Sequence, residues 1–290
     1  MKLLNILRRA SRPGSQLASR SRHAAALLLV SALAATPPAF ADFEKIQKNG
    51  VLKVAVYEEF PPYSQKQEGI DVDLAQALAS KLGLKVSLLP FTAGENLNDD
   101  LRNMVWKGHY LGYGPADVLL HVPYDKQLIA ANQQVEIFAP YHTETVRLVR
   151  NTAKVPEFSG MDSLVGKKIG VEKVSISGVV LLGEADGKFR DSTQIFSTAA
   201  EALEKLKAGE LDAVLANRSE IESALRDAPN FAMHDVTFQR LPRKGWIVGM
   251  AVKKDNLELA RRLQAATNEL FESGEMAKIF AKHGVQIVKP

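Results

Sequence analysis

The feature that most constrains the fold is an alternation of strand-like and helix-like segments that begins after Gly50. The apolar run at 51–58 has the length of a buried strand, and segment 71–84 carries leucines on one helical face. The same order continues with a strand at 85–89, a helix at 98–108 and a strand at 116–120. This βαβαβ order predicts a parallel sheet covered by helices.

The alternation restarts in the second half of the chain. A strand is predicted at 166–172, and a later helix opens on a capping box formed by Thr198 and Glu201. A further strand follows at 211–216, and the C-terminal segment reads as amphipathic helix with stops at Gly274 and Gly284. The fold class is therefore α/β, with two similar halves.

Two long extended segments, 138–154 and 238–254, connect these halves, and neither has the Gly/Ser-rich composition of a floppy linker. Two strand-like crossovers between two α/β lobes predict a hinge with a ligand cleft between the lobes, beyond the carboxyl ends of the strands. The predicted domains are lobe 1, residues 42–143 and 248–290, and lobe 2, residues 144–247.

Residues 1–41 are predicted to be a cleavable signal peptide that directs the protein to the periplasm. Six basic residues and no acid precede the apolar run 24–35, and small residues at Ala39 and Ala41 place the cut after Ala41. An apolar run of this length is well short of the ~20 residues needed to cross a bilayer. A membrane anchor is therefore the poorer interpretation.

Charge and composition exclude several classes of function. Six of the 37 basic residues lie in the leader, which leaves 31 against 33 acidic residues and a formal charge of −2 in the mature chain. No nucleic-acid partner is implied. The chain has no cysteine, and we find no phosphate loop, no G-x-S-x-G or H-E-x-x-H motif and no metal-ligand spacing. We therefore expect no cofactor, no metal and no enzymatic activity.

Four stretches resemble the family 3 periplasmic solute-binding proteins, the amino-acid-binding components of ABC importers. The resemblance implies a two-lobe (type II) periplasmic binding protein fold, a small organic solute, an ABC permease as partner and a monomer. The matching stretches are "VAVYEEFPPYS", "GIDVDLAQALASKLGLKV", "LVGKKIGVEKVS" and "AGELDAVLAN" with "GMAVKKDN".

The chain departs from that family at the residues that hold an α-amino acid. The family's arginine, which pairs with the ligand carboxylate, falls near Ile129, and the acid that meets the ammonium is replaced by Asn217. A third element keeps Ser175 but has Val174 where the family has glycine. The resemblance therefore predicts a solute other than a standard α-amino acid.

Residues expected to contact the solute lie in the first loop, in the turn after strand 116–120, in the crossover segment 138–154 and in the second lobe. Asp125 could instead cap the next turn, and Trp246 could simply pack at the hinge. Arg243 and Lys244 could reach a closed cleft or stay solvated. The candidate ligand-binding residues are Glu59, Phe60, Tyr63, His121, Tyr124, Asp125, Tyr141, Ser175 and Asn217.

Two other functions stay open from the sequence. The run 106–125, "WKGHYLGYGPADVLLHVPYD", is similar to divergent relatives associated with periplasmic quinoprotein (methanol-type) dehydrogenases, which implies an accessory protein that contacts the dehydrogenase. An enzyme such as a dehydratase would need an acid of raised pKa positioned in the cleft.

Overall fold

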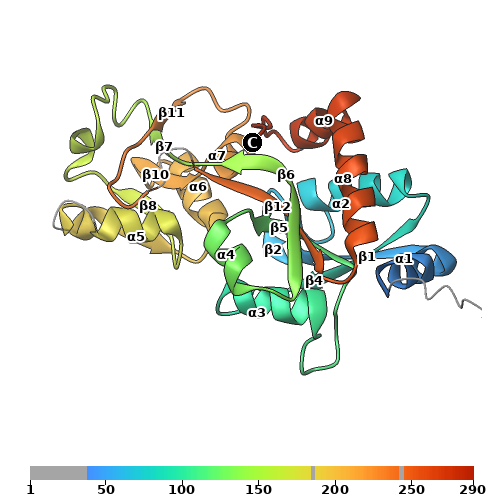
Figure 1. The fold of residues 1–290 in the computed structure, drawn as a ribbon. Helices are drawn as coiled ribbons and strands as arrows, with labels where there is room; N and C mark the ends of the chain where they lie inside the picture. Colours follow the sequence, from blue (N-terminus) through green and yellow to red (C-terminus); the bar gives the residue numbers. More distant parts are fainter. Residues whose placement is uncertain (1–37, 184–186, 242–244) are drawn as a thin grey trace, which may run out of the picture. The chain divides into compact units, whose positions relative to one another are not determined.

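The structure is a computed structural model that describes residues 38–183, 187–241 and 245–290 (Figure 1). Residues 1–37 of the predicted leader lie outside this range. Helix α1 (Pro38–Asn49) is the first described element and contains the predicted cleavage point. Among the described residues, no helix is both long enough and apolar enough to span a membrane.

The first sheet has five strands in the order β4-β1-β5-β12-β6. β4, β1 and β5 run parallel, as the alternating pattern predicts, whereas β12 pairs antiparallel with both β5 and β6. The strands are β1 (Val51–Tyr57), β4 (Lys85–Phe91), β5 (Val118–Pro123), β6 (Val135–Glu144) and β12 (Trp246–Lys253). The sheet is therefore mixed, since both crossover segments contribute strands to it.

Helices cover both faces of this sheet because each buries an apolar stripe on it. α2 (Ile70–Lys81) and the C-terminal helices pack on one face, and the α3 region packs on the other. Gly274, with φ 73°, separates the two C-terminal helices, as predicted. The remaining bounds are α3 (Leu97–Leu101), continued by a π-helical turn (Arg102–Trp106), α4 (Lys126–Ala131), α8 (Leu257–Glu272), α9 (Glu275–Lys282), and a small hairpin of β2 (Glu59–Phe60) and β3 (Ser64–Gln65).

The second sheet has the order β11-β7-β10-β8-β9 and its own two apolar clusters. The predicted capping residue begins α6, where Thr198 Oγ1 accepts a hydrogen bond from the Glu201 amide. The reciprocal half of the predicted capping box is not formed, because the Glu201 carboxylate accepts from the Ser197 amide instead. Strands β9 and β11 and helix α7 had no counterpart in the sequence pattern. The bounds are β7 (Val146–Asn151), β8 (Ile169–Glu172), β9 (Thr193–Phe196), β10 (Ala213–Asn217), β11 (Phe231–Asp235), α5 (Ile176–Gly183), α6 (Ala199–Lys207) and α7 (Arg218–Ala224), with short 3₁₀ turns at Met161–Leu164 and Arg190–Ser192.

The chain changes sheets within the two predicted crossovers. β6 ends in the first sheet at Glu144, and β7 begins in the second at Val146. The chain returns to the first sheet at Trp246, the first residue of β12. The crossover strands thus bring side chains of both sheets to one region, which is where the candidate site lies.

The prediction that strand 116–120 breaks into a turn at His121 was wrong. β5 continues to Pro123, because its last residues pair with β12. Val122 lies opposite Gly249 and Leu119 opposite Ala251, so two residues of β5 face one residue of β12. This β-bulge, in which His121 has φ 59°, re-aims the His121 side chain without ending the strand.

Candidate functional site

A cavity of about 790 Å³ lies at the carboxyl ends of the parallel strands of both sheets. From the first sheet it is lined by Tyr57 at the end of β1, by the segment that follows β4, and by His121 in β5. From the second sheet it is lined by Glu172 and Asn217, the last residues of β8 and β10. Ligand sites in open α/β folds lie in this position, so the cavity is the candidate solute site.

Acidic side chains dominate the charge of this cavity. No lysine or arginine is found among its described lining residues. Arg243 and Lys244, for which the sequence left open whether they reach a closed cleft or stay solvated, lie outside the described part of the chain. The acidic lining residues are Glu58, Glu59, Glu95, Asp100, Glu144 and Glu172.

Burial raises the cost of these negative charges. Desolvation raises the pKa of Glu172, and it raises the pKa of Asp100 although the Gly94 amide and the Tyr57 hydroxyl donate hydrogen bonds to that carboxylate. Burial beside Asp100 also raises the pKa of Tyr57 well above its ordinary value, so this phenol stays protonated. A positive charge placed in the cavity would offset the carboxylates' lost hydration.

Aromatic side chains line the same cavity as the carboxylates. The Phe60 ring makes an edge contact with Tyr57, at 5.9 Å between centroids, and with His121, at 4.8 Å. Trp246 lines the cavity from the start of β12 and packs against apolar clusters of both sheets. The cavity therefore offers aromatic faces and carboxylates together.

His121 lines the cavity with only 7% of its surface exposed, and its imidazole makes no hydrogen bond to the described residues. Its backbone amide donates to the Tyr141 hydroxyl at 3.0 Å, and that hydroxyl donates to Asp71 at 3.1 Å. The His121 Nδ1 lies 3.5 Å from the second Asp71 oxygen, too far for a good hydrogen bond. A buried imidazole without a partner at a cavity wall is a candidate contact for a bound molecule.

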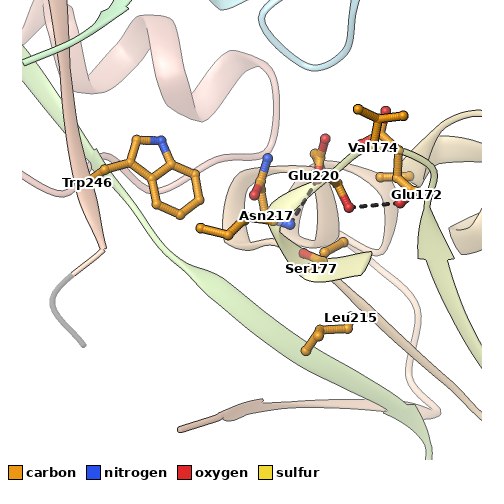
Figure 2. Close-up of a pocket in the computed structure, with 11 residues that line it drawn as sticks. Glu172, Val174, Ser177, Leu215, Asn217, Glu220 and Trp246 are labelled. Atoms are coloured by element: carbon orange, nitrogen blue, oxygen red, sulfur yellow. Dashed lines mark hydrogen bonds between the residues drawn. The ribbon is translucent and has the colours of Figure 1, made fainter. Parts of the chain in front are cut away.

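A second cavity, of about 220 Å³, adjoins the first (Figure 2) and shares Glu172, Val174, Asn217 and Trp246 with it. Ser175 lines this smaller cavity, but its hydroxyl is already used. It donates to the Glu172 carbonyl at 2.8 Å and accepts from the Gly178 amide at 3.0 Å. The backbone amide of Asn217 donates to the buried Glu220 carboxylate at 2.8 Å, and this hydrogen bond fixes the start of α7.

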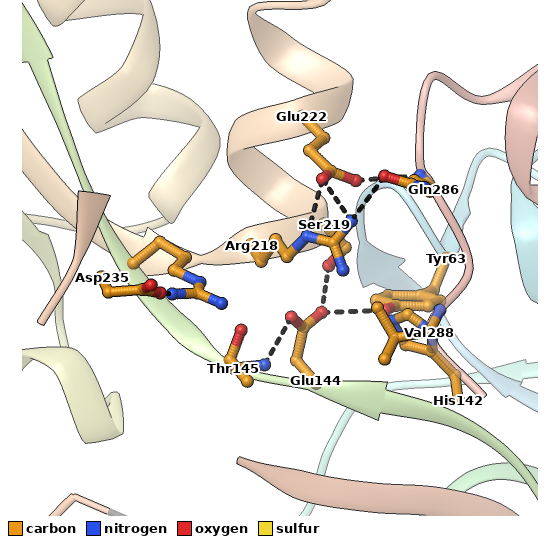
Figure 3. A network of polar contacts seen from close by, with 11 residues as sticks. Tyr63, His142, Glu144, Thr145, Arg218, Ser219, Glu222, Asp235, Gln286 and Val288 are labelled. Atoms are coloured by element: carbon orange, nitrogen blue, oxygen red, sulfur yellow. Dashed lines mark hydrogen bonds and ion pairs between the residues drawn. The ribbon is translucent and has the colours of Figure 1, made fainter. Parts of the chain in front are cut away.

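Glu144 forms a buried junction between the two sheets (Figure 3). Its carboxylate accepts from the Tyr63 hydroxyl at 2.9 Å and from the Thr145 amide at 2.8 Å. Ser219, in the first turn of α7, donates to the same oxygen as Tyr63. Tyr63 belongs to the loop after β2, so one carboxylate links a lobe 1 loop to a lobe 2 helix beside the cavity.

The structure brings together only some of the predicted ligand-binding residues. Glu59, Phe60, His121 and Asn217 line the large cavity, and Ser175 lines the small one. Tyr63 and Tyr141 are fully buried behind the wall and support Glu144 and His121. Tyr124 is nearly half exposed and lines neither cavity. The assignment of these residues to solute binding stays a prediction.

Asp125 has the capping contact that the sequence left open. Its carboxylate accepts from the amides of Gln127 and Leu128, each at 2.9 Å, at the start of α4. It is not among the residues that line the two cavities. The helix cap is therefore the interaction that the structure records for this side chain.

We expect Asp125→Ala to lower the free energy of unfolding by about 1 kcal/mol, because two helix amides lose their acceptor. Asp125→Asn is the matched control, since asparagine caps helices nearly as well and should keep most of the stability. Urea unfolding of the two variants measures both effects. Equal losses in both variants would contradict the cap as the main role of this residue.

Several lining residues were missed by sequence reasoning, namely Tyr57, Glu95, Asp100 and Glu144. Tyr57 ends a predicted strand, and Glu95 lies in the loop after the next strand, so their position at strand ends was the usable signal. Asp100 lies within α3, and Glu144 ends a crossover strand. No local pattern distinguishes those two from solvated acids. Among the described residues, no cluster of three or more histidine or acidic side chains could hold a metal ion.

Two α/β sheets joined by strand crossovers, with a cavity at their carboxyl edges, define the two-lobe fold of the periplasmic binding proteins. No protein-family model matches the chain. A "Probable histidine-binding protein" of Neisseria gonorrhoeae is 25% identical over 244 residues, which cover 80% of this chain and 82% of that protein.

Solved structures agree on the fold. An ancestral cationic amino acid solute-binding protein superposes with a TM-score of 0.66 at 20% identity, covering 84% of this chain and 99% of that one. An amino acid ABC transporter substrate-binding protein from Streptococcus pneumoniae, bound to L-arginine, gives a TM-score of 0.61 at 19% identity over 87% and 100% of the two chains. The relatives are binding proteins, and none of these three is described as an enzyme.

Proposed function

We propose that this protein is a periplasmic solute-binding protein that holds a small organic solute between its two lobes and delivers it to an ABC permease. The observation that carries the proposal is the cavity of about 790 Å³ formed by strand ends of both sheets. A solute that contacts both lobes favours the closed arrangement, because only that arrangement lets it bind all its partners.

The proposed solute differs from a standard α-amino acid. The position of the family's arginine, Ile129, lies in α4 and does not line the large cavity. The position of its acid is Asn217, whose side chain brings no charge to the wall. A carboxylate bound in water-poor surroundings needs a paired cation or several donors, and a guanidinium supplies both best. None of the described lining residues provides one.

The test is the melting temperature of the mature chain, from Asp42, against amino acids, organic acids, amines and alcohols. A solute at a hundredfold over its Kd stabilises by ~2.7 kcal/mol, and each kcal/mol raises the Tm of a chain this size by ~2–4 °C. We expect a rise of about 5–10 °C for the cognate class and none for glutamate, histidine or arginine. Strong stabilisation by those three amino acids would contradict the reading of Ile129 and Asn217.

An accessory role beside a quinoprotein dehydrogenase is the second candidate function. The observation that favours it is a loop after the α3 region in which Tyr110 and Leu111 are 88% and 68% exposed. Exposed apolar side chains of this size are typical of contact surfaces. If no small molecule shifts the melting temperature and a dehydrogenase co-purifies with the chain, the accessory role replaces transport.

A further inference from the structure

Resting on the proposed function, we propose that the solute is a small organic amine that carries no carboxylate, bound as its ammonium ion between the acidic and aromatic walls of the large cavity. The charge of the lining is the first argument. Six carboxylates line the cavity, and no lysine or arginine does among the described residues. An anionic solute would be repelled by this net negative lining, whereas a cation would be attracted to it.

The second argument separates an amine from an amino acid. A zwitterion would bring its own carboxylate next to Glu172 or Glu144, with no cation of the described lining to receive it. The Ser175 hydroxyl, which the family resemblance would give to that carboxylate, already donates to a backbone carbonyl. The α-carboxylate therefore weakens binding, while the ammonium strengthens it.

The third argument is the hydrogen-bonding and ring chemistry at the first-lobe wall. His121 is buried and lines the cavity, and no hydrogen bond of its imidazole to the described residues is recorded, so the ring can receive an N–H group of the solute. Phe60, Tyr57 and Trp246 present rings to the same space, and ammonium groups bind over aromatic faces. An alcohol could also use His121 and donate to a carboxylate, but it has no positive charge to gain from the carboxylates or from the aromatic faces.

The experiment compares ligands of similar length that differ in charge, by isothermal titration calorimetry on the mature chain. Putrescine is the amine, ornithine adds a carboxylate to it, 1,4-butanediol is neutral and succinate is the dianion. We expect putrescine to bind at least tenfold more tightly than the other three and to weaken as salt is raised from 50 to 500 mM, because its partners are charges. Tighter binding of ornithine or succinate would overturn the proposal.

Substitutions in the cavity test whether its carboxylates contribute to the binding of putrescine. Glu58→Gln, in the first lobe, and Glu172→Gln, in the second, each remove one charge and keep the shape, and each should weaken putrescine binding by roughly tenfold. Glu44→Gln is the control, since Glu44 is an exposed α1 residue with no recorded contact. Equal effects of all three substitutions would leave only non-specific attraction by net charge and would overturn the site.

The same measurements distinguish a wrong ligand class from a wrong proposal of solute binding. If a neutral or anionic molecule stabilises the chain and no amine does, the protein is a solute-binding protein with another ligand class, and the amine proposal is wrong. If no molecule of any class stabilises it, both proposals fail.

Discussion

Replacing Glu144 by alanine is expected to lower the free energy of unfolding by about 3 kcal/mol. The carboxylate is 1% exposed and accepts hydrogen bonds from Tyr63, Ser219 and Thr145. Without it, the buried Tyr63 and Ser219 hydroxyls lose their acceptor, at about 1–3 kcal/mol for each unsatisfied group. Part of that loss is offset because a desolvated charge is removed as well.

Thermal and urea unfolding of Glu144→Ala measure this change. Glu157→Ala is the matched control, because Glu157 is an exposed glutamate of the second lobe with no recorded contact, and its replacement should change stability by less than about 0.5 kcal/mol. Glu144→Gln keeps an acceptor oxygen and should lie between the control and the alanine variant. If Glu144→Ala is as stable as the control, the junction contributes nothing to the fold.

Gly69→Ala is expected to destabilise the chain by about 3 kcal/mol or more, because this position excludes a side chain for two separate reasons. Gly69 has φ 133° and ψ 177°, a backbone conformation that is essentially restricted to glycine. A Cβ there would lie 2.3 Å from the Tyr63 carbonyl oxygen and 2.9 Å from that of Pro62. Both are backbone atoms of the loop that precedes α2, so neither can move aside without disturbing that loop.

Gly50→Ala is the control for this prediction. Gly50 also has a positive φ, 67°, but no atom lies within 4 Å of a Cβ added there. It should lose only the cost of a left-handed alanine, about 1 kcal/mol. Urea unfolding of both variants separates the clash from the backbone preference, and equal losses would show that the contact with the Tyr63 carbonyl has no energetic weight.

The loop that Gly69 fixes also supports the cavity. The Asp71 amide donates to the Tyr63 carbonyl, and the Asp71 carboxylate accepts from Tyr141 beneath His121. A change at Gly69 is therefore expected to alter the positions of both Tyr63 and His121. This is why the predicted ligand residues Tyr63 and Tyr141, although buried, matter to the shape of the site.

Periodicity was sufficient to predict most of the regular elements. Apolar runs gave β1, β4, β8 and β10, and helical spacing with the Thr198 capping box gave α2 and α6, because these signals depend only on neighbouring residues. The course of β5 past Leu120 could not be predicted. It depends on pairing with β12, which is more than a hundred residues away in the chain.

The residues of the candidate site also fall into those that the sequence predicted and those that only the structure revealed. Glu59, Phe60, His121 and Asn217 line the cavity. The family resemblance implied Phe60, His121 and Asn217 as candidate contacts, and Glu59 was a candidate in the first loop. The loss of the family's charged anchors predicted a solute other than a standard α-amino acid, but it did not predict the overall charge of the cleft. The structure instead places acids from both lobes around it, including Asp100 within α3 and Glu144 in a crossover strand.

By itself, the sequence determined the α/β class, the two halves and the absence of an arginine at the position near Ile129, since each depends on local pattern or on composition. Only the tertiary structure decided which acids share one cavity, and that Asp125 caps a helix while Glu144 joins two sheets. The physical reason is that a side chain's surroundings are set by long-range strand pairing and chain reversal. The same carboxylate can be solvated or buried depending on contacts that no neighbouring residue specifies.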